Sequence, residues 1–239
     1  LAAANWWDGT SINRVQDNYV VQWGDATEKK ALPEGLVVVP EGEYEVDPGF
    51  NARELRQELG VVGLPERGSV RDVFAPQVAL WRGWPIGLEN LSYDTRKLRG
   101  WPTHCYGMVG VARNLSPDTG TGAELYTVIG HAPRHLDRNI ALVGRVIEGM
   151  EHLSSLPRGT GALGFYEKAE ERVPIVSVRL ASELENDKSF PTYEYLSTES
   201  ASFAAYADAR ANRRDPFFIK PAGGADICNI PVPVRRKGK

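Results

Sequence analysis

This sequence has no long apolar run, no surplus of basic charge and few cysteines. No apolar stretch approaches the roughly 18 residues that a membrane-spanning helix needs, so we expect no membrane span. The 28 Lys and Arg face 31 Asp and Glu, and the formal net charge of -3 argues against broad electrostatic binding to nucleic acid. Two cysteines, Cys105 and Cys228, cannot make a zinc site or a disulfide framework by themselves. One long-range bridge between them and two buried thiols are both compatible with the sequence.

Standard catalytic motifs are also missing. The sequence contains no Gly-x-Ser-x-Gly, no phosphate-binding glycine loop and no dinucleotide-binding fingerprint. His131 and His135 have the four-residue spacing of a helical metal pair, but Pro133 between them indicates a loop. His104 and Cys105 are adjacent, and adjacent side chains of an extended chain point to opposite faces, which argues against a nucleophile–base pair. The sequence therefore predicts neither a metal site nor a cofactor.

The chain is rich in short strand-like segments. Its 239 residues, 42% of them hydrophobic, suit one large domain with extensions. Alternation of apolar and polar residues predicts two strands within 12–25, broken at Asp17-Asn18, and further strands over 107–114, 123–130, 140–147 and 173–181. Short strands joined by Gly- and Pro-rich connections favour a mainly β fold, either a barrel or a sandwich.

Helical patterns are fewer. Capping residues and amphipathic spacing predict helices over 51–60, 148–156 and 198–216. In the last of these, Thr198 is placed to cap the first turn and Asp215-Pro216 to close the helix. One side of this helix is apolar and is formed by Phe203, Tyr206 and Ala207.

An arginine and a glutamine, Arg14 and Gln22, stand among the apolar and aromatic residues of the first two predicted strands. Arginine often lies on apolar surface only because its stem is aliphatic. The same combination suits one cofactor-free reaction, the rotation of an X–Pro bond, whose barrier of roughly 18–20 kcal/mol comes from amide resonance. In the twisted state the prolyl nitrogen regains its lone pair, so a fixed guanidinium binds that state better than either planar one.

Several segments together resemble the cyclophilin family of peptidyl-prolyl isomerases. They are "INRVQDNYVVQWGD", "GMVGVARN", "AELYTVIG" and "HLDRNIALVGRVIEGM", in the order and spacing of that family's strands. The likeness covers residues 6–25 and 107–181 and is greatest to a bacterial branch with long inserts, in which "LPRGTGALGFYEK" also occurs. It implies a closed, eight-stranded antiparallel barrel with capping helices. It also implies a rotamase that acts on proline-containing peptides and folding proteins.

The resemblance implies roles for individual residues. Arg14 falls on the catalytic arginine, and Gln22 falls on the glutamine that helps to hold the arginine and the peptide. The positions that contact substrate correspond to Tyr19, Val20, Ala112, Arg113, Glu124, Tyr126, His135, Leu136 and Ile140. Three of these depart from the residue usual in the family, since Glu124 replaces Gln, Tyr126 replaces Phe and Ile140 replaces His. The hydroxyl of Tyr126 needs water or a protein partner if it is buried.

The resemblance also divides the chain. We expect residues 1–182 to form the isomerase domain, with a long insert over 26–106 beside the site, and residues 183–239 to be an extension packed on the barrel. The two strands that precede the arginine strand in the family have no counterpart in the sequence. We expect a separate fragment, another part of the protein or a neighbouring molecule to supply them.

Two functions fit these patterns. The first is catalysed isomerisation of X–Pro bonds, and the second is a non-catalytic proline-peptide-binding or chaperone module that uses the same groove. The residues at Glu124, Tyr126 and Ile140 favour the second. The likeness to exported bacterial members predicts a periplasmic location, with the cytoplasm as the alternative, and the sequence does not indicate an oligomeric state.

Overall fold

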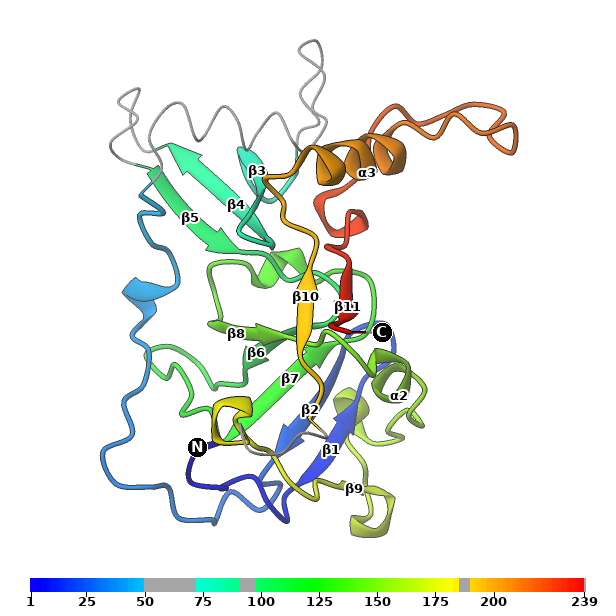
Figure 1. Cartoon of the computed structure of the whole chain (residues 1–239). Helices are drawn as coiled ribbons and strands as arrows, with labels where there is room; N and C mark the ends of the chain where they lie inside the picture. The colour runs from blue at the N-terminus through cyan, green and yellow to red at the C-terminus, as the bar shows by residue number, and fades with distance from the viewer. Residues whose placement is uncertain (50–71, 91–97, 185–189, 239) are drawn as a thin grey trace. The chain divides into compact units, whose positions relative to one another are not determined.

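The structure is a computed structural model, and it describes residues 1–49, 72–90, 98–184 and 190–238. The helix predicted over 51–60 lies outside these residues. The chain forms two compact units, Leu1–Tyr44 with His104–Pro191 and Glu45–Thr103 with Thr192–Lys239 (Figure 1). All of the site residues predicted from the sequence belong to the first unit.

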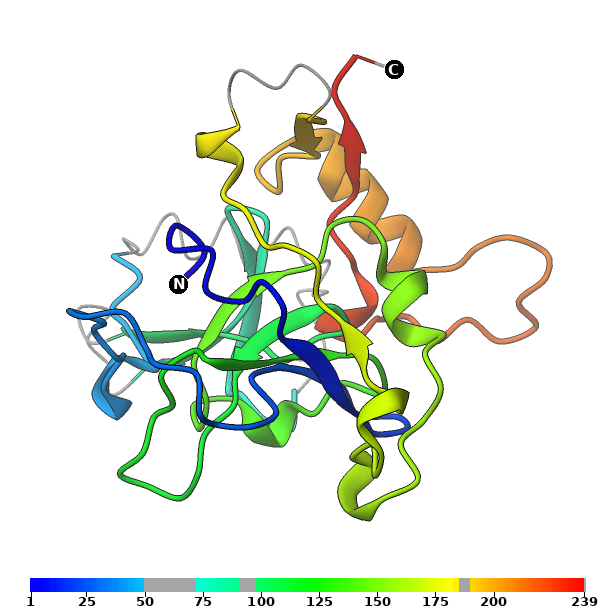
Figure 2. The same cartoon turned by 90° about the horizontal axis from the view of Figure 1, so that it is seen from below.

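The first unit is built around a six-stranded antiparallel sheet with the order β8-β6-β7-β2-β1-β9. Its strands are β1 (Ser11–Val15), β2 (Val20–Gly24), β6 (Met108–Val111), β7 (Glu124–Val128), β8 (Leu142–Arg145) and β9 (Val173–Pro174). All of the predicted strand segments are confirmed as strands, and Figure 2 shows β1 beside the short β9. The strand predicted over 173–181 is much shorter than expected. Beyond Pro174, only Ile175 among the described residues still pairs, backbone to backbone, with the segment before β1: its N–H donates to the carbonyl of Thr10 over 2.8 Å, and its carbonyl accepts the N–H of Gly9 over 3.0 Å.

Within the described residues the sheet has β8 and β9 as its two ends and does not close. The mainly β fold predicted from the sequence is confirmed, whereas the closed eight-stranded barrel is not seen in this part of the chain. The short helices around the sheet are α2 (Met150–Ser154) and the 3₁₀ turns η1 (Glu41–Glu43), η2 (Arg134–Leu136), η3 (Ala162–Gly164), η4 (Ala169–Glu171) and η5 (Ala181–Glu183). The helix α2 lies inside the segment 148–156 that was predicted to be helical.

Alternation along the central strands gives the sheet two different faces. One face belongs to apolar clusters of the core, which contain Ile12, Val21, Trp23, Val111 and Leu125. Val20 and Gln22 of β2 lie opposite Val128 and Tyr126 of β7. Because successive side chains of a strand point to opposite faces, these four side chains share the other face. That second face carries the candidate site.

The second unit combines two small sheets and a helix. Strands β3 (Gln77–Trp81), β4 (Trp84–Asn90) and β5 (Leu98–Pro102) form an antiparallel meander, and β10 (Tyr193–Tyr195) pairs with β11 (Val234–Arg236). The helix α3 (Ala201–Ala211) and the turn η6 (Ile227–Asn229) complete the unit. Its main core cluster contains Val78, Leu80, Trp101, Phe203, Ala207, Ile227 and Ile230. Described residues of the predicted insert and of the predicted extension therefore share one core.

The helix α3 corrects the prediction over 198–216. Its cap is Ser200, whose Oγ accepts a hydrogen bond from the backbone N–H of Phe203, and not Thr198. The hydroxyl of Thr198 instead accepts the N–H of Gly83. The helix ends at Ala211, before the predicted stop, while Phe203 and Ala207 are buried as the amphipathic spacing indicated.

Candidate functional site

A β-bulge sets the geometry of the site. Ile12 pairs with Trp23 and Arg14 pairs with Gln22, so β1 contains one residue, Asn13, that has no partner on β2. A bulge of this kind breaks the strict alternation of side chains along a strand. As a result, Asn13 and Arg14, although adjacent, both make hydrogen bonds to polar groups of the site.

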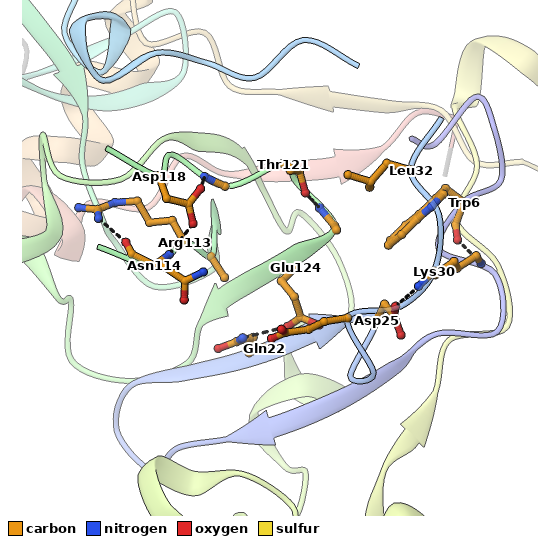
Figure 3. Close-up of a pocket in the computed structure, with 14 residues that line it drawn as sticks. Trp6, Gln22, Asp25, Lys30, Leu32, Arg113, Asn114, Asp118, Thr121 and Glu124 are labelled. Carbon is orange, nitrogen blue, oxygen red and sulfur yellow. Dashed lines mark hydrogen bonds between the residues drawn. The ribbon is translucent and has the colours of Figure 1, made fainter. Parts of the chain in front are cut away.

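A chain of hydrogen bonds connects these groups. Arg14 Nη1 donates to Gln22 Oε1 over 3.1 Å, and Gln22 Nε2 donates to a carboxylate oxygen of Glu124 over 2.8 Å. Asn13 Nδ2 donates to both oxygens of Glu124, at 2.9 and 3.2 Å. Every donor meets an acceptor, so the arginine and the carboxylate together determine which way the amide of Gln22 faces. Figure 3 shows the link between Gln22 and Glu124.

The guanidinium of Arg14 is held from several sides. Its Nε donates to the carbonyl oxygen of Leu163 over 2.7 Å, and its Nη2 donates to Gln16 Oε1. The aromatic rings of Phe165 and Tyr19 lie 5.3 and 5.9 Å from its central carbon, within the range of cation–π attraction. Burial lowers the pKa of Arg14, but a guanidinium stays charged at any physiological pH. With Gln22, these contacts engage three of its five N–H donors and leave two available to a bound molecule.

Apolar and aromatic side chains surround this arginine. Val20 and Tyr126 are nearly buried, with 3% and 5% of their surface exposed, on the face that carries Gln22. The ring of Tyr19 stacks on that of His135, with centroids 6.3 Å apart and planes 7° from parallel. The structure thus places the ring of Tyr19 beside Arg14, and Val20 and Tyr126 on the face that carries Gln22; that they form a pocket for a proline ring stays a prediction.

A cavity of about 300 Å³ adjoins Gln22 and Glu124 (Figure 3). It is also lined by Trp6, Asp25, Glu28, Lys30, Leu32, Ala112, Arg113, Asn114, Asp118, Gly120, Thr121 and Ala123. The predicted residues Ala112 and Arg113 therefore face the same space as the polar chain. Arg113 is fixed there, because its Nε and Nη2 donate to the carbonyl oxygen of Asn139 over 3.0 and 2.9 Å.

Several carboxyl groups of this region have shifted pKa values, among them those of Glu124 and Asp25. Burial raises the pKa of Glu124, and the hydrogen bonds from Gln22 and Asn13 offset only part of that effect. Burial also acts to raise the pKa of Asp25, but hydrogen bonds from the backbone N–H groups of Lys30, Thr27 and Lys29 and from the Thr27 hydroxyl lower it to about 2. The first carboxylate belongs to the Arg14–Gln22 chain, whereas the second organises the loop at the cavity wall.

Other predicted positions are less directly connected. Leu136 lies in η2 and Ile140 follows shortly after, and both are half-buried. Their contribution to substrate binding stays a prediction. Neither Cys105 nor Cys228 is a free thiol. In the described ranges no group of three or more His, Cys, Asp or Glu could hold a metal ion, and no helix is long and apolar enough to cross a membrane.

Sequence reasoning missed several residues of the site. Asn13, Gln16 and the carbonyl of Leu163 hold the polar chain, and Trp6 and Lys30 line the cavity. The signal for Asn13 was present, since a buried amide next to Arg14 needs a polar partner. The carbonyl of Leu163 has no such signal, because any residue supplies one.

Comparisons with known proteins agree with this geometry. A family model described as "Cyclophilin type peptidyl-prolyl cis-trans isomerase/CLD" matches residues 1–180. The crystal structure of cyclophilin AquaCyp293 from Hirschia baltica is similar in fold, with a TM-score of 0.65 over 98% of this chain and 79% of that chain. The two sequences are 21% identical. Nothing among the curated proteins matches the chain.

Proposed function

Because the chain belongs to the family of cyclophilin-type peptidyl-prolyl cis-trans isomerases, we propose that Arg14 assists the rotation of X–Pro bonds in its protein substrates. The observation that carries this proposal is the position of the guanidinium. It is fixed by Leu163, Gln16 and Gln22, lies beside the aromatic rings of Phe165 and Tyr19, and has two N–H donors not used in these hydrogen bonds. The reaction is non-covalent and uses no cofactor.

The mechanism follows from the barrier of the reaction. Rotation removes the resonance of the X–Pro amide, which costs roughly 18–20 kcal/mol, and localises a lone pair on the prolyl nitrogen. An N–H of Arg14 directed at that nitrogen meets a good acceptor only in the twisted state. The interaction therefore lowers the barrier rather than stabilising the bound planar substrate. Gln22 keeps the guanidinium in place, so that no reorganisation accompanies the rotation.

The surrounding residues would hold the substrate while it rotates. In this proposal, the proline ring rests against Tyr19, Val20 and Tyr126, because burying its apolar surface fixes one side of the rotating bond. The backbone at Ala112 and Arg113 pairs with the peptide chain, and His135, Leu136 and Ile140 complete the pocket wall. The cavity beside Glu124 then receives peptide residues next to the proline.

A measurement of X–Pro isomerisation tests the role of Arg14. We expect Arg14→Ala to reduce kcat/KM by about 10²- to 10³-fold, the cost typical of losing one preorganised transition-state donor. Arg14→Lys should also be slow, because an ammonium cannot reach three acceptors and the prolyl nitrogen together. Arg179→Ala is the matched control, since Arg179 makes a partly exposed ion pair with Asp8. An Arg14→Ala variant that folds and is as fast as the wild-type protein would contradict the mechanism.

NMR of an X–Pro peptide in the presence of the protein distinguishes catalysis from simple binding. A non-catalytic module that holds proline-containing segments, or a chaperone that uses this groove, would shift the NMR signals of a peptide without exchange between its cis and trans forms. The isomerase gives both the shifts and the exchange. Exchange that depends on Arg14 therefore supports the enzyme and excludes the binding-only alternative.

Three further statements stay proposals. The closed barrel follows from the family resemblance, and the packing of residues 183–239 on the barrel is expected because this segment is not of low complexity and contains aromatic residues. A periplasmic location is supported by the absence of a free thiol at Cys105 and Cys228, because disulfides persist in oxidising compartments. Fractionation of cells that express the natural protein tests the location.

A further inference from the structure

A second polar network lies under the candidate site. The ring of His104 is fully buried, and its Nδ1 lies 2.9 Å from Asp137 Oδ1 while its Nε2 lies 2.8 Å from the hydroxyl of Tyr126. Asp137 Oδ1 also accepts the backbone N–H of His104, and Asp137 Oδ2 accepts Arg134 Nε over 2.5 Å. All four side chains are at most 6% exposed. A buried ion pair thus supports a buried imidazole, which in turn contacts the pocket tyrosine.

The direction of these hydrogen bonds follows from the ion pair. Asp137 is a carboxylate because it faces the guanidinium of Arg134, so it only accepts hydrogen bonds. His104 therefore carries a hydrogen on Nδ1, and in the imidazole tautomer with its hydrogen there, Nε2 is the acceptor. Tyr126 is the only donor that the described residues place at Nε2. Burial raises the pKa of Tyr126, so its hydroxyl keeps the hydrogen that it donates.

The ring of Tyr126 has little freedom between these neighbours. It lies opposite Gln22 in the β2–β7 register and opposite Gly110 in the β6–β7 register. A Cβ atom at Gly110 would come within 2.3 Å of the Tyr126 hydroxyl oxygen and 2.4 Å of the ring carbon that bears it. The ring therefore lies directly against the backbone of Gly110, and His104 holds its far end. Both Gly110 and His104 are therefore needed to hold the ring of Tyr126 in this position.

We propose that His104 is a positioning residue for the isomerase site, because it fixes the ring of Tyr126 against which the substrate proline packs. This inference rests on the proposed function, in which Tyr126 lines the proline pocket. His104 contacts no substrate, and its effect passes through the tyrosine hydroxyl. The Arg134–Asp137 pair sets the tautomer that makes His104 an acceptor.

Two substitutions at position 104 separate the two bonds of the imidazole. The side-chain amide of asparagine reaches about as far as Nδ1, so His104→Asn retains a donor to Asp137 and loses the acceptor for Tyr126. The amide of glutamine reaches about as far as Nε2, so His104→Gln retains the acceptor. We expect kcat/KM of His104→Asn to fall by roughly three- to tenfold, the effect of one neutral hydrogen bond. His104→Gln should stay closer to the wild-type value, and the loss should appear mainly in KM, since the pocket binds the ring in all states of the substrate.

A double-mutant cycle with Tyr126→Phe gives the decisive result. Without the hydroxyl, the Asn and Gln variants at position 104 should have equal kcat/KM, because the group through which His104 acts is gone. Equal values for the two variants in the presence of Tyr126, with normal folding by circular dichroism, would overturn the inference. If neither variant at position 104 folds, Tyr126→Phe alone decides. An unchanged KM in Tyr126→Phe, with unchanged NMR signals from the aromatic rings around residue 126, would contradict the inference. The proposed function is tested separately: a loss of activity in Arg14→Ala relative to the wild-type protein supports it, whatever the result at position 104.

Discussion

The carboxylate of Glu124 offers a sensitive test of the polar chain that holds Arg14. It accepts three hydrogen bonds, one from Gln22 and two from Asn13. In Glu124→Gln one of the two acceptor oxygens becomes an amide donor, which then faces Asn13 Nδ2 or Gln22 Nε2. If Gln22 turns its amide to avoid this conflict, it presents its own donors to Arg14. Either arrangement loosens the guanidinium.

The magnitude follows from the charge of the acceptor. A hydrogen bond to an ionised group contributes roughly 1.5–3 kcal/mol, about twice that of a neutral one. If the loss of one such bond raises the transition-state barrier by the lower limit of this range, about 1.5 kcal/mol, the rate falls about tenfold. We therefore expect kcat/KM of Glu124→Gln to be about one tenth of the wild-type value near neutral pH.

The pH dependence has a definite sign. Burial raises the pKa of Glu124 in the folded protein above its ordinary value of 4.5. Its contribution to stability is therefore fully present below 4.5 and is lost as the pH rises through the folded pKa. Activity behaves in the opposite way, because only the carboxylate accepts from both Gln22 and Asn13. Wild-type kcat/KM should thus fall as the pH is lowered through the raised pKa, while the stability of the fold gains from protonation at this position.

Exchange NMR on an X–Pro peptide measures this profile without a coupling protease, which would itself titrate. The wild-type protein should show a step above pH 4.5 that is absent from Glu124→Gln, and the two should approach each other on the acid side. Glu170→Gln is the matched control, because Glu170 is an exposed carboxylate outside the site. Parallel profiles for the wild-type protein and Glu124→Gln, with both folded, would refute the role of this carboxylate.

Two further predictions concern stability and redox state. Asp25→Asn should lower the free energy of unfolding by roughly 1 kcal/mol at neutral pH, because a carboxylate accepts backbone N–H groups better than an amide does. Since its folded pKa of about 2 lies below 3.8, this contribution is present above 3.8 and should vanish towards pH 2 in urea unfolding curves; a pH-independent difference would contradict it. Thiol titration of the unfolded, unreduced protein should detect neither Cys105 nor Cys228, and reduction should expose both. Reactive thiols before reduction would disprove the bond.

The sequence allowed the strands to be predicted better than their ends. Alternation located every strand of the six-stranded sheet, because successive side chains of a strand point to opposite faces and a period of two follows. The length of β9 depends on where the segment after Ile175 leaves the residues before β1, and the cap of α3 depends on the N–H of Gly83, which donates to the hydroxyl of Thr198. Both outcomes arise from contacts between distant segments, which local patterns do not contain.

In the candidate site, too, local patterns predicted some residues, while contacts between distant segments determined the others. Resemblance to a family assigned Arg14 and Gln22 to one site, and the structure places Arg14 Nη1 3.1 Å from Gln22 Oε1, while their roles in catalysis stay a prediction. The bulge at Asn13 could not be predicted, because it is defined only by the register of β1 against β2. The sequence shows only Cys105 as an adjacent candidate partner of His104. The hydrogen-bond partners of His104 in the structure are Tyr126 and Asp137, 22 and 33 residues away.

Two of the three substitutions that favoured a binding-only module, Glu124 and Tyr126, support that interpretation less once their neighbours are known. Glu124, in place of the usual Gln, is matched by the donors of Asn13 and Gln22, and its carboxylate determines the orientation of the amide that faces Arg14. Tyr126, in place of the usual Phe, has its added hydroxyl satisfied by His104 in the buried interior. An unpaired polar group at either position would cost roughly 1–3 kcal/mol and would indicate a degraded site. Paired as they are, both residues fit a site that still holds its arginine in one place, which is the property that X–Pro rotation demands.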